Sequence, residues 1–102
     1  MHIEINYRDG QSSQSLDARI TESLESTLGH LADKLTRIEV HLGDENAHKS
    51  GPNDKRCLIE ARPKGLDPIA VETHGEDLYD TFEEGAKKLK RALSKKFDKL
   101  DG

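Results

Sequence analysis

The chain has 102 residues, enough for one compact domain and too few for two. Apolar residues make up 32% and charged residues 35%, so the core must be thin, and the single cysteine excludes both an internal disulfide and a cysteine-rich zinc module. A formal net charge of −4 argues against a uniformly basic nucleic-acid binder. Because no apolar run reaches membrane length and no secretory signal is present, we expect a cytoplasmic protein that does not enter membranes.

The N-terminal half of the sequence predicts a strand, a helix and a second strand. Apolar and polar side chains alternate over residues 2–7, which is typical of a half-buried strand. Apolar residues then recur every three or four positions over 16–35, which predicts an amphipathic helix of about 15 to 18 residues whose last turn is weakened by Gly29. Alternation returns over 38–42, and the polar stretch 43–54 predicts a loop.

The C-terminal half predicts two further strands and a long helix. Residues 57–61 alternate, the prolines that bound 63–68 predict a turn, and 69–73 form the fourth expected strand. From Asp77 onward the apolar residues follow a helical period to the end of the chain. The sequence therefore predicts a single domain over residues 1–102. Its fold class is α+β, a two-layer β-α-β-β-β-α sandwich in which a four-stranded sheet carries both helices on one face.

Most of the positive charge is concentrated in the predicted last helix. Between Gly85 and Leu100 seven basic residues face Asp98 alone, which leaves 9 basic and 19 acidic residues elsewhere. On a helical wheel four of them fall together on one flank of the apolar stripe, with Lys87 at the edge of that flank. The four are Lys88, Arg91, Lys95 and Lys99. Such a row suits the phosphates of a nucleic-acid backbone, and a solvated face that complements the helix dipole gives the same pattern.

No other group of residues points to chemistry. The five histidines lack the close spacing of metal ligands, so no metal site is predicted. Cys57 takes an inward position in its predicted strand and is expected to be a small buried apolar residue rather than a nucleophile. Glycine-rich phosphate loops are absent from the sequence. We therefore expect no catalytic residue, no enzyme activity, no cofactor and no small-molecule substrate.

The last helix also carries a resemblance to a known family. Asp77-Leu78-Tyr79 opens the helix, and Lys88-Leu89-x-Arg91-x-Leu93-x-Lys95 follows within it. Together with the predicted strand order, these residues resemble the ribosome hibernation promoting factors and protein Y-type ribosome-associated inhibitors, also called sigma-54 modulation proteins, in their short form. The resemblance covers essentially the whole chain and is best over 54–100.

The resemblance implies a fold similar to that of double-stranded-RNA-binding domains. It also implies that the protein binds the small ribosomal subunit and its ribosomal RNA near the decoding region, where it inhibits translation by occupancy under stress or in stationary phase. The chain is expected to be a monomer off the ribosome. Lys88, Arg91, Lys95 and Lys99 would face ribosomal RNA, and the predicted RNA-binding set adds Lys87 and, on the first helix, Arg19. Tyr79 matches a family tyrosine that either packs near the sheet or stacks on RNA.

The first helix departs from the family pattern. Its predicted outer face carries Asp17, Glu22 and Glu25, and Arg19 is the only cation on that face before Lys34. Two functions therefore stay open at this point. The first is a ribosome-bound inhibitor of translation. The second is a divergent relative that has lost ribosome binding and serves as a protein-interaction or stress-adaptor module.

Overall fold

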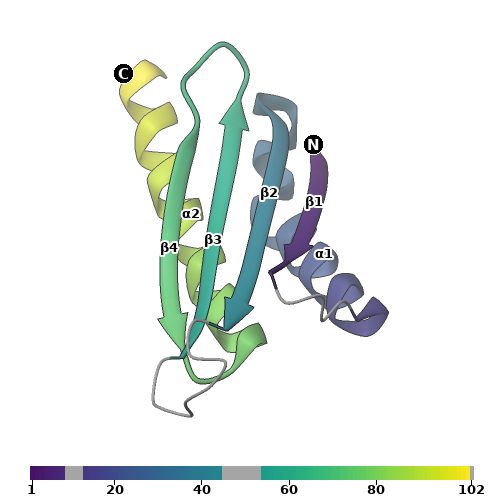
Figure 1. Ribbon diagram of the computed structural model, residues 1–102. Helices are drawn as coiled ribbons and strands as arrows, with labels where there is room; N and C mark the ends of the chain where they lie inside the picture. Colours follow the sequence, from purple (N-terminus) through teal and green to yellow (C-terminus); the bar gives the residue numbers. More distant parts are fainter. Residues whose placement is uncertain (9–12, 45–53, 102) are drawn as a thin grey trace.

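Two helices cover one face of a four-stranded sheet (Figure 1). The computed structural model describes residues 1–8, 13–44 and 54–101. The elements in chain order are β1 (His2–Tyr7), α1 (Gln14–Leu28), the 3₁₀-helix η1 (Gly29–Lys34), β2 (Leu35–Asp44), β3 (Lys55–Pro63), β4 (Ile69–Gly75) and α2 (Leu78–Asp101). The strand order is β1-β2-β3-β4, with β1 parallel to β2 and the other pairs antiparallel. The predicted two-layer α+β architecture and element order are confirmed.

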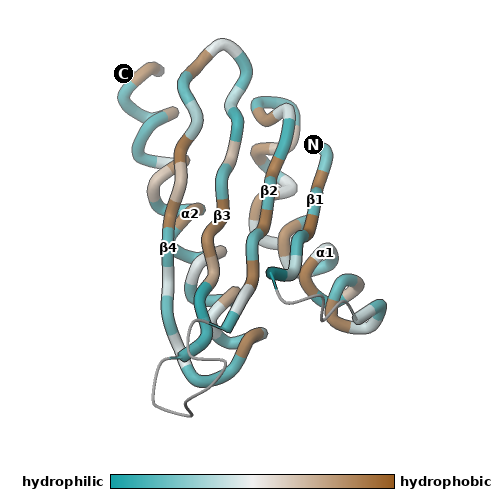
Figure 2. Tube along the Cα trace, in the orientation of Figure 1, coloured by the Kyte–Doolittle hydropathy of each residue, from teal (hydrophilic) through white to brown (hydrophobic). Residues whose placement is uncertain are grey.

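The register of the strands builds one apolar face. Ile5 pairs with Val40, Val40 with Ile59, and Ile59 with Val71, so an apolar row crosses all four strands. Figure 2 shows hydrophobic and hydrophilic residues alternating along the strands, as expected where only one face of a sheet is covered. The apolar face packs under the helices, and the opposite face of the sheet is polar and open.

Helix α2 packs closely against the part of this face formed by β3 and β4. The side chains of its inner stripe are buried: Phe82, Ala86, Leu89, Leu93 and Phe97. Gly85 lies between two turns of this stripe, and a Cβ atom there would be 3.1 Å from both Ile59 Cδ1 and Thr73 Oγ1. The missing side chain therefore lets the helix backbone approach β3 and β4.

Helix α1 has 15 residues, in agreement with the predicted length of about 15 to 18, but the apolar repeat over 16–35 continues past its end. Helix α1 ends at Leu28, and the chain continues as η1 before Leu35 opens β2. Leu31 and Leu35 are nevertheless buried, 8% and 1% exposed. Apolar spacing of three or four residues is compatible with either helix type, so periodicity alone did not show that the α-helix ends at Leu28, just before Gly29, a residue of low helix propensity.

The strands on either side of the predicted loop 43–54 are longer than expected. Strand β2 includes Gly43 and Asp44, and β3 begins at Lys55 and not at Cys57. Residues 45–53 of the predicted loop lie outside the described residues.

Replacing Leu89 by alanine tests the importance of the inner stripe of α2. Leu89 is fully buried, so Leu89→Ala should lower the free energy of unfolding by about 2 to 5 kcal/mol. Leu100 lies on the same helix and is 56% exposed, so Leu100→Ala should change it by less than about 0.5 kcal/mol. Urea denaturation of both variants measures the difference. Equal losses at the two positions would contradict the assigned inner face.

Candidate nucleic-acid interface

Side-chain hydrogen bonds fix the start of α2. The Asp77 carboxylate accepts a hydrogen bond from the Asp80 backbone N–H at 2.9 Å, which caps the helix. The Thr81 hydroxyl donates to the Asp77 carbonyl at 2.7 Å, and the Thr73 hydroxyl donates from β4 to the Thr81 carbonyl at 2.8 Å. Together with the buried stripe, these bonds set the rotation of the helix about its axis.

This rotation places one set of α2 side chains on the outer surface of the molecule. Between them, on the second half of the helix, lies a shallow open depression of about 790 Å³, which we call the cationic groove. The cationic groove is lined by Lys87, Lys90, Arg91, Ser94, Lys95, Asp98 and Lys99. Five cations and one carboxylate give it a formal charge of +4. Within residues 1–8, 13–44 and 54–101, none of these five cations has a side-chain hydrogen bond or ion pair. Their charges are therefore available to a ligand.

Four of the six predicted RNA-binding residues line the cationic groove. On α2 the lining differs from the prediction at two positions, Lys88 and Lys90. Lys87, Arg91, Lys95 and Lys99 line the groove. Lys88 does not, because its Nζ donates to the Glu72 carbonyl of β4 at 3.3 Å. Sequence reasoning did not select Lys90. The signal was present, because Lys87, Lys90 and Ser94 recur at spacings of three and four residues and therefore share one side of a helix.

Arg19 belongs to a different part of the surface. Its guanidinium lies 3.8 Å from the ring centroid of Tyr79, and the Ser23 hydroxyl donates to Glu83 at 2.5 Å. These four residues form an interhelical cluster that joins α1 to the first half of α2. The cluster lines a separate depression of about 390 Å³, which also includes Glu22 and has no lining residue in common with the cationic groove.

The surroundings of Tyr79 favour a packing role for its ring. Arg19 covers one face of it, and Phe82 packs against it at a centroid distance of 5.9 Å and an interplanar angle of 44°. Burial, with a smaller contribution from the hydrogen bond to Glu83, raises the pKa of the Tyr79 hydroxyl. Of the two sequence-based interpretations, packing within the protein is the one that this geometry supports.

The exposed side of α1 is acidic, as the sequence predicts. Glu22 and Glu25 are exposed on this helix, and the guanidinium of Arg19 is held against Tyr79. One additional cation approaches α2 from η1, where Lys34 Nζ lies 4.9 Å from the ring centroid of Phe97. The cationic groove is therefore formed by α2 itself and not by two matching basic helices.

Cys57 belongs to the hydrophobic core and not to the cationic groove. Cys57 is fully buried, and burial raises the pKa of its thiol to about 12, so it stays protonated at neutral pH. Among the described residues no group of three or more His, Cys, Asp or Glu side chains could hold a metal ion. The helices within the described ranges are all too short or too polar to cross a membrane.

Comparisons with known proteins place the sequence and the fold. A family model described as Sigma 54 modulation protein / S30EA ribosomal protein matches residues 3–101. A ribosomal subunit interface protein from Coxiella burnetii has a similar structure, with a TM-score of 0.72 and 21% identity over 96% of this chain and 99% of that one. The N-terminal domain of Thermus thermophilus Protein Y gives a TM-score of 0.73 and 18% identity over 93% and 98% of the two chains. No curated protein matches the sequence. The predicted likeness to double-stranded-RNA-binding domains stays a prediction.

A double-mutant cycle tests whether Arg19 stabilises the interhelical cluster. Arg19→Ala, Tyr79→Leu and the double variant should give a coupling free energy of about 0.5 to 1 kcal/mol in urea unfolding, because the guanidinium lies over the ring. Arg91→Ala is the control, since Arg91 has no side-chain partner among the described residues, and it should change the free energy of unfolding by less than about 0.5 kcal/mol. Zero coupling between Arg19 and Tyr79 would contradict the structural role.

Proposed function

The chain belongs to the family of sigma 54 modulation proteins and S30EA ribosomal proteins, and from that membership we propose that it is a ribosome-associated hibernation factor. It binds the ribosomal RNA of the small subunit through the cationic groove of α2. Bound near the decoding region, it inhibits translation by occupancy, under stress or in stationary phase, and it acts in the cytoplasm. The Coxiella burnetii protein of the same fold is itself named for the ribosomal subunit interface.

The single observation that carries the proposal is the set of cations on α2 that have no side-chain partner in the part of the chain that the structure describes. From Lys87 to Lys99 the helix extends about 18 Å along its axis at 1.5 Å per residue, so several consecutive phosphates can be in reach. A lysine or arginine that already has a carboxylate partner must release that partner to bind a phosphate, whereas these five have no such partner to release among the described residues. Binding through phosphates supplies affinity and position without base recognition.

The proposed mechanism is steric and uses no covalent step. The protein acts as one domain and as a monomer, and the family match over residues 3–101 supports a single unit. Occupation of the small subunit by a rigid sheet-and-helix body excludes other ligands from the same space. The buried Cys57 thiol, protonated at neutral pH, has no part in this mechanism.

One observation favours a second candidate function, in which the protein binds a basic protein instead of RNA. Glu22 and Glu25 are exposed on α1, and the depression at the interhelical cluster contains the carboxylates of Glu22 and Glu83. A lysine- or arginine-rich segment of a protein would complement this surface electrostatically. Such a module would keep the family fold without binding ribosomes.

Paired charge reversals on α2 test the proposed RNA interface. The variant Arg91→Glu with Lys95→Glu reverses two cations of the groove. It should bind isolated small subunits on the order of a hundred-fold more weakly, because each phosphate contact contributes about 1.5 kcal/mol or more. Co-sedimentation of purified protein with small subunits at several protein concentrations measures the affinity.

The matched control reverses two cations of the same helix that do not line the groove. Lys88→Glu with Lys96→Glu changes the net charge by the same amount, and both side chains are exposed. This control should lose much less affinity than the groove variant. Equal losses would indicate that only net charge matters, and an unaffected groove variant would show that the interface is wrong. Recovery of a basic protein partner after ribonuclease treatment, without ribosome binding, would favour the second candidate function.

The salt dependence of binding reports how many phosphates the protein contacts. A groove of formal charge +4 that neutralises about four phosphates should lose roughly a hundred-fold in affinity between about 50 and 200 mM salt. Arg91→Gln with Lys95→Gln should lower the slope of log K against log salt by about two. Equilibrium binding to small subunits at five or more salt concentrations gives the slope. The same slope for both proteins would exclude these two residues from the phosphate contacts.

A further inference from the structure

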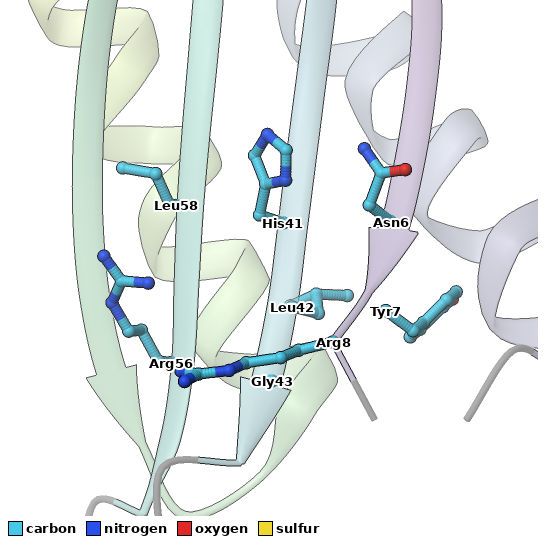
Figure 3. A pocket seen from close by; sticks show the side chains of 8 residues that line it. All are labelled: Asn6, Tyr7, Arg8, His41, Leu42, Gly43, Arg56 and Leu58. Carbon is cyan, nitrogen blue, oxygen red and sulfur yellow. The ribbon is translucent and has the colours of Figure 1, made fainter. Parts of the chain in front are cut away.

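The open face of the sheet contains a pocket of about 360 Å³ near the C-terminal ends of β1 and β2 (Figure 3). Its lining residues are Asn6, Tyr7, Arg8, His41, Leu42, Gly43, Arg56 and Leu58. We call it the sheet pocket. It lies on the opposite layer from α2, and it has no lining residue in common with the cationic groove. A volume of this size is at the lower end of the range for small-ligand sites.

The pocket exists because a glycine lies between two arginines. Gly43 of β2 pairs with Arg56 of β3. On the other side of Gly43, the Arg8 backbone N–H donates to the Leu42 carbonyl at 2.8 Å, and this bond extends the pairing of β1 with β2 one residue beyond Tyr7. Arg8 lies across Gly43 toward Arg56 (Figure 3). A Cβ atom at Gly43 would be 3.0 Å from Arg8 Cβ and 3.2 Å from Arg8 Cδ. Any larger residue would displace Arg8 and fill the hollow.

The two arginines of this pocket differ in their side-chain partners. The other arginines of the open face have carboxylate partners: Arg37 with Glu4 and Glu39, Arg62 with Glu60, and Arg56 with Glu72. The Arg8 guanidinium has no side-chain hydrogen bond or ion pair with residues 1–8, 13–44 or 54–101. Two guanidinium groups therefore lie at one pocket: Arg56 is held by Glu72 and has a further contact, whereas Arg8 has no side-chain partner among the described residues.

One row of residues beside the arginines is suited to a flat, partly apolar group. Asn6 pairs with His41, and His41 pairs with Leu58, so the three side chains lie next to one another on β1, β2 and β3 (Figure 3). The Leu58 side chain and the imidazole of His41 offer a surface on which a planar ring can pack. The Asn6 amide has both a donor and an acceptor for the polar edge of such a ring.

We propose that the sheet pocket binds one nucleotide, with its phosphate held by Arg8 and Arg56 and its base packed against His41 and Leu58. The planar guanidinium fork forms paired hydrogen bonds to phosphate oxygens. The nucleotide is either free in solution or part of an RNA strand, since the chemistry recognised is the same. In the second case the protein contacts RNA from both layers, the helices and the sheet.

Titration with adenosine monophosphate tests the proposal on the free protein. Isothermal titration calorimetry or NMR chemical shifts should detect binding, and adenosine, which has no phosphate, should bind at least 10-fold more weakly. Arg8→Gln should weaken the binding of adenosine monophosphate at least 10-fold, and because Arg8 is exposed this variant should fold normally. Gly43→Val, which displaces Arg8, should have the same effect.

The groove variant Arg91→Glu with Lys95→Glu is the matched control, and it should bind adenosine monophosphate as the unmodified protein does. In that same background, binding of a six-nucleotide single-stranded RNA that is lost with Arg8→Gln would identify the source as an RNA strand. Absence of Arg8-dependent binding of both the mononucleotide and the RNA would overturn the proposal. No ribosome is present in these measurements, so their failure is distinct from failure of the proposed function.

Discussion

Burial of the apolar stripe of α2 against the sheet is the constraint on which the rest of the structure depends. Phe82, Leu89 and Leu93 are fully buried, and Gly85 allows the helix backbone to approach β3 and β4. Once this stripe is buried against the sheet, the rotation of the helix about its axis is fixed. The same rotation determines which charged residues point outward. The position of the cationic groove is therefore a consequence of core packing, and a change that rotated α2 would move the groove without altering a single cation.

The two halves of α2 make different contacts. In the first half Tyr79 and Glu83 join the helix to α1 through Arg19 and Ser23. In the second half the cations of the groove have no side-chain partners among the described residues. The helix dipole favours cations toward the C-terminal end, so the groove is compatible with stability. A net charge of −4 conceals this segregation.

Sequence periodicity predicted those parts of the fold in which burial is one-sided. The strands and α2 have an apolar face and a polar face, so spacing alone identified them. Spacing did not give the structure of the segment from Gly29 to Leu35, because its leucines stay buried through a change from α-helix to 3₁₀-helix to strand. The helical wheel placed most groove cations correctly, but the contact of Lys88 with β4 depends on tertiary structure. For the same reason, the pairing of Arg19 with Tyr79 and the hollow over Gly43 could not be predicted from sequence.

Tethered hydroxyl-radical cleavage tests most directly whether the cationic groove faces RNA. Cys57 is the only cysteine, so a Cys57→Ala background allows one iron chelate to be attached at Ser94→Cys, within the groove. The control attachment is Glu25→Cys, because Glu25 is exposed on the acidic side of α1 and does not line the cationic groove. In complexes with small subunits, position 94 should cleave ribosomal RNA strongly and position 25 weakly. No cleavage from position 94, or cleavage no stronger than from position 25, would contradict the account.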